Sequence, residues 1–150
     1  YIFKFISIHP ASDDVQFTFQ ASTNGGSSYG VATTQTSFFA FHLENGSDQS
    51  LGYSTTFDGG ENTTSFLTIA DTIGNDNDQS GSGFLHLFDP SNTTFVKHFI
   101  ARTSVVVNND RAEDNFIAGY FNTTTALTRV QFKFASGNID AGTFKMYGVV

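Results

Sequence analysis

The chain has 150 residues, a formal net charge of −7 and no cysteine. The lack of cysteine excludes disulfides and thiolate metal sites, and the lack of a basic stripe removes the electrostatic basis for binding nucleic acid or an anionic membrane. Hydrophobic residues make up 39% of the chain, which contains eighteen Phe, so the sequence predicts one ordered domain over residues 1–150.

Alternation of apolar and polar side chains, typical of strands with one buried face, runs through most of the chain. Phe17 and Phe19, for example, alternate with Thr18 and Gln20. In chain order, the expected strands are 2–8, 15–22, 36–43, 51–57, 63–70, 83–88, 94–101, 103–107, 115–121, 126–134 and 142–149. Gly, Asn, Asp and Ser clusters separate them and favour tight turns.

No window of the sequence shows the 3.6-residue period of a helix. We expect about eight to ten strands among these eleven ranges, and short strands separated by turns predict an all-β fold, a two-sheet β-sandwich that is jelly-roll-like. Residues 38–41, apolar on both faces, are expected to lie centrally or under a neighbouring subunit. The last strand, 142–149, is expected to pair inside a sheet. Because Tyr1 rather than Met is first, we expect the true start of the chain to lie upstream.

Residues 26–30, G-S-S-Y-G, match the G-x-S-x-G pattern of a nucleophile elbow. That device needs a strand, a sharp turn and then a helix beside an oxyanion hole. The residues that follow, VATTQTSFF, are typical of a strand, so the pattern favours a plain Gly/Ser loop. Because no catalytic constellation is found elsewhere, we expect no enzymatic activity.

Asp76, Asp78 and Ser80 begin a D-x-D-x-S-G pattern, the first half of a calcium loop. The bidentate Glu expected at the twelfth position is absent, and Leu87 stands there. A Ca²⁺ site completed by Asp71 or a distant acid remains one interpretation. A solvated loop is the favoured one, because half a motif is a weak signal. No other cofactor is expected.

Two further groups of polar residues have alternative interpretations. Asp110, Glu113 and Asp114 beside Arg111 predict a solvated or salt-bridged surface turn, or alternatively a contact with a basic patch on a partner. His86 and His98 flank one apparent loop and could face each other across paired strands. A metal site there would lack its third and fourth ligands.

Residues 118–150, AGYFNTTTALTRVQFKFASGNIDAGTFKMYGVV, resemble the C-terminal segment of small virion structural proteins from tailed phages of marine bacteria. The shared features are a G-Y-x-N-T-T-T-A-L pattern, a strand that ends in S-G-N-I, and a final G-T-x-K-x-Y-G strand. Residues 86–102, HLFDPSNTTFVKHFIAR, are similar to the same group. The resemblance covers residues 86–150, and it implies a β-rich accessory protein of the virion surface, assembled in the cytoplasm of a bacterial host.

Two functions follow from the resemblance and the composition. The first is a capsid decoration or knob protein that docks on the major capsid protein or other virion proteins, with homo-oligomers as a further option. Because residues 76–150 hold six of the seven bases, Lys97, Arg102, Arg111 and Arg129 are candidates to face an acidic shell. The alternative is a carbohydrate- or receptor-binding module of a fibre or tail. That module would use Tyr29, Tyr53 and Tyr147, with calcium at Asp76 and Asp78.

Overall fold

The computed structural model describes residues 1–60 and 62–149. They form ten strands: β1 (Ile2–Pro10), β2 (Val15–Ser22), β3 (Thr33–Leu43), β4 (Gln49–Tyr53), β5 (Leu67–Ile73), β6 (Gly81–Leu87), β7 (Lys97–Val107), β8 (Arg111–Phe121), β9 (Arg129–Phe134) and β10 (Ile139–Tyr147). Over these residues there is no helix long and apolar enough to cross a membrane.

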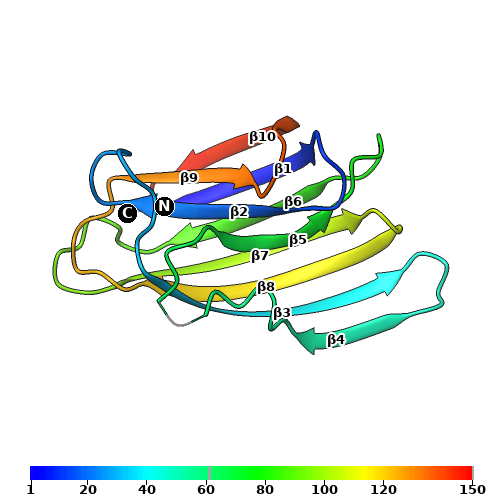
Figure 1. Ribbon diagram of the computed structural model, residues 1–150, viewed down its shortest axis with the longest axis horizontal. Coiled ribbons are helices and arrows are strands. Elements are labelled where there is room, and N and C mark those ends of the chain that lie inside the picture. The colour runs from blue at the N-terminus through cyan, green and yellow to red at the C-terminus, as the bar shows by residue number, and fades with distance from the viewer. Residues whose placement is uncertain (61, 150) are drawn as a thin grey trace.

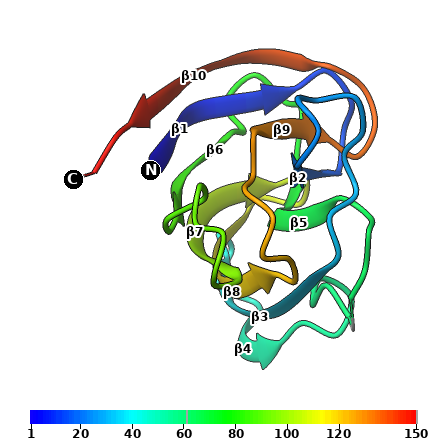
Figure 2. The same ribbon diagram turned by 90° about the vertical axis from the view of Figure 1, so that its left-hand side faces the viewer.

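The strands form two antiparallel sheets of unequal size (Figure 1). The larger has the order β10-β1-β6-β7-β8-β3-β4, and the smaller has the order β5-β2-β9. Viewed end-on, the seven-stranded sheet curls around the three-stranded one (Figure 2). The predicted all-β, two-sheet sandwich is thus confirmed, with ten strands divided seven and three. We call the face of the large sheet that points away from the small sheet the outer face.

Strand β7 shows how the alternating pattern decides the fold. Its odd-numbered residues are buried, whereas its even-numbered residues are exposed or half-buried. The prediction of two strands, 94–101 and 103–107, is wrong here, because β7 continues through Arg102 without a break. Arg102 falls on an outward position, where a charged side chain reaches water and needs no interruption of the strand.

Phenylalanine rings fill the space between the two sheets. Phe17 on β2 lies 5.2 Å from Phe5 and 5.3 Å from Phe134, measured between ring centroids. Phe19 lies 4.9 Å from Phe99, again with the rings nearly perpendicular. Edge-to-face and tilted pairs of this kind add to the gain from burying the rings. The core is therefore a continuous aromatic layer that joins β2 to the centre of the large sheet.

The last strand pairs in a sheet, as the sequence predicted, but it lies at the edge of that sheet. β10 pairs with β1 alone and forms the edge of the large sheet, with all nine of its residues exposed. The small sheet has only three strands, so it does not bury this end of the larger sheet. Phe144 packs 5.6 Å from Phe5 on the inner side and is still 41% exposed.

Candidate functional site

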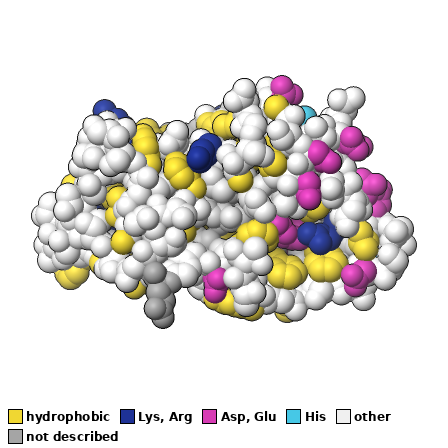
Figure 3. Space-filling view, in the orientation of Figure 1, with side chains coloured by type: hydrophobic (Ala, Val, Ile, Leu, Met, Phe, Trp, Pro, Cys, Tyr) yellow, Lys and Arg dark blue, Asp and Glu magenta, His cyan; other side chains and the backbone are white. Residues whose placement is uncertain are grey.

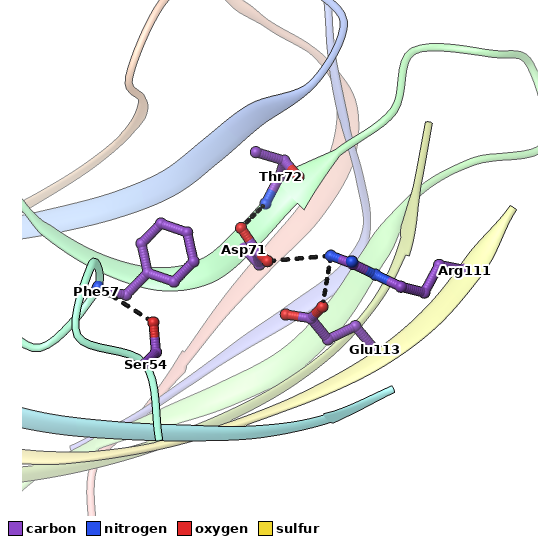
Figure 4. Close-up of polar contacts among 6 residues, drawn as sticks. All are labelled: Ser54, Phe57, Asp71, Thr72, Arg111 and Glu113. Atoms are coloured by element: carbon purple, nitrogen blue, oxygen red, sulfur yellow. Dashed lines mark hydrogen bonds and ion pairs between the residues drawn. The ribbon is translucent and has the colours of Figure 1, made fainter. Parts of the chain in front are cut away.

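A buried charged cluster joins the two sheets (Figure 4). Asp71 belongs to β5 of the small sheet, whereas Arg111 and Glu113 are alternate residues of β8 and both face inward. The Arg111 Nη2 atom lies 2.7 Å from Glu113 Oε2 and 3.3 Å from Asp71 Oδ2. The guanidinium also stacks on the ring of Phe41, at 4.7 Å from the ring centroid. One cation thus bridges two carboxyl groups from opposite layers.

The protonation of this cluster is set by burial. Desolvation, the largest cause, and the neighbouring Asp71 carboxyl together raise the pKa of Glu113 to about 8, against the opposing effect of Arg111. Below that pH, Glu113 is protonated and adds no negative charge to the buried cluster. Two ionised carboxylates facing one cation would be unfavourable in a water-poor interior.

The structure corrects the prediction that Asp110, Glu113 and Asp114 form a surface turn. Glu113 is inward-facing and 2% exposed, whereas Asp114 points outward and binds Arg102. Asp110 lies in the turn after β7, and its Oδ1 accepts a hydrogen bond from Gln79 Nε2. The strand period separates neighbouring acids onto opposite faces. The cluster holds the two layers together, because its members come from both sheets.

Lys97 is the second buried charge. Its side chain is 0% exposed, and its ammonium donates hydrogen bonds to the carbonyl oxygens of Phe95 (2.9 Å) and Thr123 (3.1 Å). Burial lowers the pKa of Lys97, and the charge of Asp89 partly opposes that shift. The prediction that Lys97 meets a partner is therefore wrong, since the side chain ties together the segments that precede β7 and follow β8.

Replacing Lys97 by alanine is expected to lower the free energy of unfolding by about 1–3 kcal/mol, because two partly buried carbonyl groups lose their donor. Urea unfolding followed by Tyr fluorescence or circular dichroism measures the effect. Lys4→Ala is the matched control, since Lys4 is exposed and its loss should change stability by less than about 0.5 kcal/mol. Equal effects of the two substitutions would contradict the role given to Lys97.

The four cations predicted to face a shell do not share one surface. Arg102 lies on the outer face and binds Asp114 through its Nε and Nη2 atoms. Arg111 belongs to the buried cluster, and Lys97 is enclosed. Arg129 lies exposed at the start of β9 in the small sheet. A single basic docking patch made of these four residues is therefore not formed.

Acidic side chains are concentrated at one end of the sandwich and come from both halves of the sequence. The loops that connect β1 to β2, β3 to β4, β5 to β6 and β7 to β8 all lie at one end of the sandwich, where carboxylates gather (Figures 1 and 3). They contribute Asp13, Asp14, Glu44, Asp48, Asp76, Asp78 and Asp110. We call this the acidic end.

The candidate calcium residues lie in the acidic end. Asp76 and Asp78 are exposed in the β5–β6 loop, and Ser80 is half-buried beside them. The backbone of this loop is held by Gln79, whose N–H donates to the Asp76 carbonyl. Among the residues that the structure describes, no three His, Cys, Asp or Glu side chains are arranged to hold a metal ion. The Ca²⁺ site stays a prediction without geometric support.

The other sequence motifs fall on separate parts of the fold. Residues 26–30 lie in the loop before β3, and a strand follows instead of the helix that a nucleophile elbow needs. His86 and His98 both lie on the outer face, but His86 is paired with Ile100, so the two histidines are out of register. His86 stacks on Phe88 at 3.9 Å, which agrees with packing rather than metal binding.

The outer face carries a row of aromatic and cationic side chains that sequence reasoning missed. Strand register places one residue from each of six neighbouring strands in line: Lys4, Phe84, Arg102, Phe116, Phe38 and Tyr53. We call these residues the outer-face row. The rings of Phe38 and Phe116 are stacked at 4.7 Å, and the Arg102 guanidinium lies 4.5 Å from the Phe116 centroid.

Large apolar side chains remain open to water along and beside this row. Phe38 is 44% exposed and Tyr53 is 55% exposed. Ile100, next to the row, opens onto a shallow hollow of ≈ 490 Å³ that includes Tyr120. Contiguous exposed aromatic surface on a folded domain is typical of an interaction site. The outer face is the strongest candidate for a functional surface on the described part of the chain.

The fold and this surface define an all-β sandwich with an aromatic outer sheet face. Comparisons with protein-family models, with curated proteins and with solved structures found no match.

Proposed function

We propose that the protein is a non-enzymatic structural protein that docks on a larger protein assembly through its outer face. The single observation that carries this proposal is the outer-face row, which crosses six strands without interruption. The resemblance of residues 86–150 favours a phage particle as the assembly, and a capsid decoration protein as the role.

The chemistry of the row supports a protein partner. Aromatic residues and arginine are enriched at the energetic centres of protein interfaces, where they are surrounded by less important contacts. Arg102 is held in position by Asp114 on one side and by the Phe116 ring beneath it. A pre-positioned side chain loses little conformational entropy on binding. The broad sheet face also suits a large partner better than a small molecule.

The position of the acidic end also supports docking through the outer face. In a particle where the outer face contacts the shell, the loops with Asp13, Asp76 and Asp110 remain free to meet solvent. Exposed charges of one sign keep particles apart by repulsion. The protein would therefore bind by its aromatic and cationic outer face and present an anionic end to water.

Phe84→Asp is expected to weaken binding to decoration-free capsids of the cognate phage by at least about a hundredfold, because the variant loses an aromatic contact and must desolvate a carboxylate at the interface. Co-sedimentation with purified capsids measures the affinity. Phe95→Asp is the matched control, because Phe95 is 68% exposed but lies in the β6–β7 loop outside the row. The proposal is wrong if the two variants bind alike, or if mass spectrometry of purified virions lacks the protein.

One observation favours a carbohydrate-binding module as the second candidate. Tyr53 pairs with Phe38 across β3 and β4, and its hydroxyl donates to Asp58 Oδ2 at 3.0 Å. Adjacent rings with a carboxylate at their edge form a platform of the kind that stacks on a sugar ring and accepts hydrogen bonds from it. Tyr147 lies at the opposite edge of the sheet and Tyr29 lies in the β2–β3 loop, so the three tyrosines form no common site.

A glycan array probed with and without a chelator distinguishes the two candidates. Specific binding that is lost in Tyr53→Ala, with capsid binding absent, would favour the carbohydrate module. Glycan binding that the chelator abolishes would support a Ca²⁺ site at Asp76 and Asp78.

A further inference from the structure

The β6–β7 loop presents Phe95, the most exposed phenylalanine among residues 1–60 and 62–149. Phe95 is 68% exposed, yet its backbone is fixed on both sides. The Phe95 N–H donates to Asn92 Oδ1 at 2.7 Å, and the Phe95 carbonyl oxygen accepts a hydrogen bond from the buried Lys97 ammonium at 2.9 Å. Burying an ammonium costs desolvation free energy, and the segment that Lys97 holds here leaves its aromatic ring in solvent. The loop therefore suits the presentation of Phe95 to a ligand.

The same loop holds a carboxylate in place. Asn92 Nδ2 donates to Asp89 Oδ2 at 2.8 Å, whereas Asp89 Oδ1 accepts no hydrogen bond from the described part of the chain. Asp89 has a φ of 38°, which is uncommon for a residue with a Cβ and lies outside the extended region that a residue before proline prefers. Strained positions of this kind are concentrated at ligand sites. Asp89 Oδ1 is thus a fixed hydrogen-bond acceptor close to the Phe95 ring.

Two hollows meet beside this loop. The first, of ≈ 500 Å³, is lined by residues that include Phe88, Asp89, Phe95 and His98. The second is the hollow of ≈ 490 Å³ that includes Tyr120, and it shares Phe88 and His98 with the first, so the two are contiguous. Each falls in the range of roughly 300–1,000 Å³ that is typical of small-molecule sites. We call the surface from Phe95 over Phe88 and His98 to Tyr120 the aromatic trough.

The polar groups of the trough narrow the class of ligand. No lysine or arginine lines either hollow, and the Asp89 carboxylate repels a phosphate, a sulfate or a carboxylate. Hydroxyl groups of Thr94, Thr124 and Tyr120 and the His98 ring line the trough and both donate and accept hydrogen bonds. Strands β6, β7 and β8 are central in the sheet, so an extended peptide cannot add a strand there. A proline-rich peptide offers mainly carbonyl acceptors and would leave Asp89 Oδ1 without a donor.

We propose that the aromatic trough binds a neutral linear oligosaccharide. One sugar ring stacks on Phe95 and donates a hydroxyl hydrogen bond to Asp89 Oδ1. The units that follow lie over Phe88 and His98 and reach Tyr120. A sugar ring carries apolar C–H faces and a rim of hydroxyl groups, so it matches both the aromatic rings and the polar side chains of the trough. Because the loop backbone is already fixed, little conformational entropy is lost when the sugar binds.

The inference goes beyond the proposed docking function and does not depend on it. Phe95 and Asp89 belong to the β6–β7 loop, outside the outer-face row, and sugar binding is measured on the free protein without capsids. A failure to bind sugar therefore leaves docking untouched, and a failure to dock leaves sugar binding untouched. The trough is also separate from the Tyr53 platform on β4, so substitutions distinguish the two sugar sites.

Isothermal titration calorimetry with neutral gluco-, manno- and galacto-oligosaccharides is expected to find at least one ligand with a Kd below about 1 mM. Phe95→Ala is expected to raise that Kd by at least about tenfold, because the stacking ring is lost. Tyr53→Ala is the matched control, since it removes an exposed ring outside the trough and should change the Kd by less than about twofold. Circular dichroism confirms that both variants are folded. Absence of binding to all of these sugars, or an equal or larger effect of Tyr53→Ala, would overturn the proposal.

The class of ligand is tested at Asp89. Asp89→Asn keeps the size of the side chain and tolerates a positive φ, but it removes the charged acceptor and is expected to raise the Kd by about tenfold. Asp58→Asn is the matched control, because Asp58 accepts its hydrogen bond from Tyr53 outside the trough. Tighter binding of a sulfated oligosaccharide, a uronic acid oligosaccharide or a proline-rich peptide than of every neutral sugar would contradict the proposed ligand.

The extension of the ligand toward Tyr120 is tested by filling the second hollow. Ala118 lines that hollow and lies between Ile100 and Thr36 in strand register, so Ala118→Leu fills it without removing a contact. The wild type is expected to bind a tetrasaccharide at least about tenfold more tightly than the matching disaccharide, and Ala118→Leu should abolish this gain. Ala112→Leu, on the outward side of the same strand, is the control. A gain that survives in Ala118→Leu would show that the sugar does not reach Tyr120.

Discussion

Phe17→Ala is expected to lower the free energy of unfolding by about 3–5 kcal/mol, the largest effect of any single substitution considered for this chain. Phe17 is 0% exposed at the centre of β2, the middle strand of the small sheet. Its ring contacts Phe5 of the large sheet and Phe134 of β9, so its removal opens a cavity that touches both layers. Urea unfolding at constant pH measures the loss.

Phe95→Ala provides the control, because it removes the same atoms from a side chain that is 68% exposed to solvent. Its effect should stay within about 0.5 kcal/mol. A loss of less than about 1 kcal/mol for Phe17→Ala would mean that the layer between the sheets is not packed as described.

The stability of the wild-type protein is expected to fall more steeply between pH 5 and pH 8 than that of Glu113→Gln. The folded state keeps the Glu113 proton up to about pH 8, whereas the unfolded chain releases it near its ordinary value of 4.5. Between these values the folded state binds more protons, so its stability is greatest at low pH and declines as pH rises. Glutamine holds the same place without a titrating proton, and its amide group replaces the protonated carboxyl as a donor toward Asp71.

The difference in free energy of unfolding between the two proteins should change by at most about 1.4 kcal/mol per pH unit in this interval. Asp114→Asn is the matched control, because Asp114 is the neighbouring residue on the outer face and pairs with Arg102. That variant should keep the wild-type slope. Parallel pH profiles for wild type and Glu113→Gln would show that Glu113 is ionised in the folded protein at pH 5.

The strands and the two layers were predictable from the sequence because alternation is a local signal. Residues 15–22 were predicted and observed as β2 with the same bounds. The same signal also identifies Lys97 as buried, since it shares the period of Phe99, Ala101 and Thr103. The sequence interpretation gave more weight to residue type than to periodicity and therefore placed Lys97 on the surface.

The site residues were less predictable because they meet through sheet register. Asp71 and Glu113 are 42 positions apart and come from different sheets, so no spacing in the sequence brings them together. The outer-face row likewise takes one residue from each of six strands. The concentration of basic residues in residues 76–150 was also misleading as a guide to one basic surface. Antiparallel strands bring loops from both halves of the sequence to the acidic end.

The position of β1 between β6 and β10 has a consequence for how the chain folds. Strand β1 completes its hydrogen bonding only after β10, which lies more than a hundred residues further along the chain, has been synthesised. Closing so long a loop is slow, because the chain loses conformational entropy before the contacts that offset this loss can form. Sheets rich in distant pairings therefore fold over milliseconds to seconds. The large sheet is therefore expected to be completed only after β10 has been synthesised, and until then β1 is an incompletely paired apolar segment that a chaperone can bind.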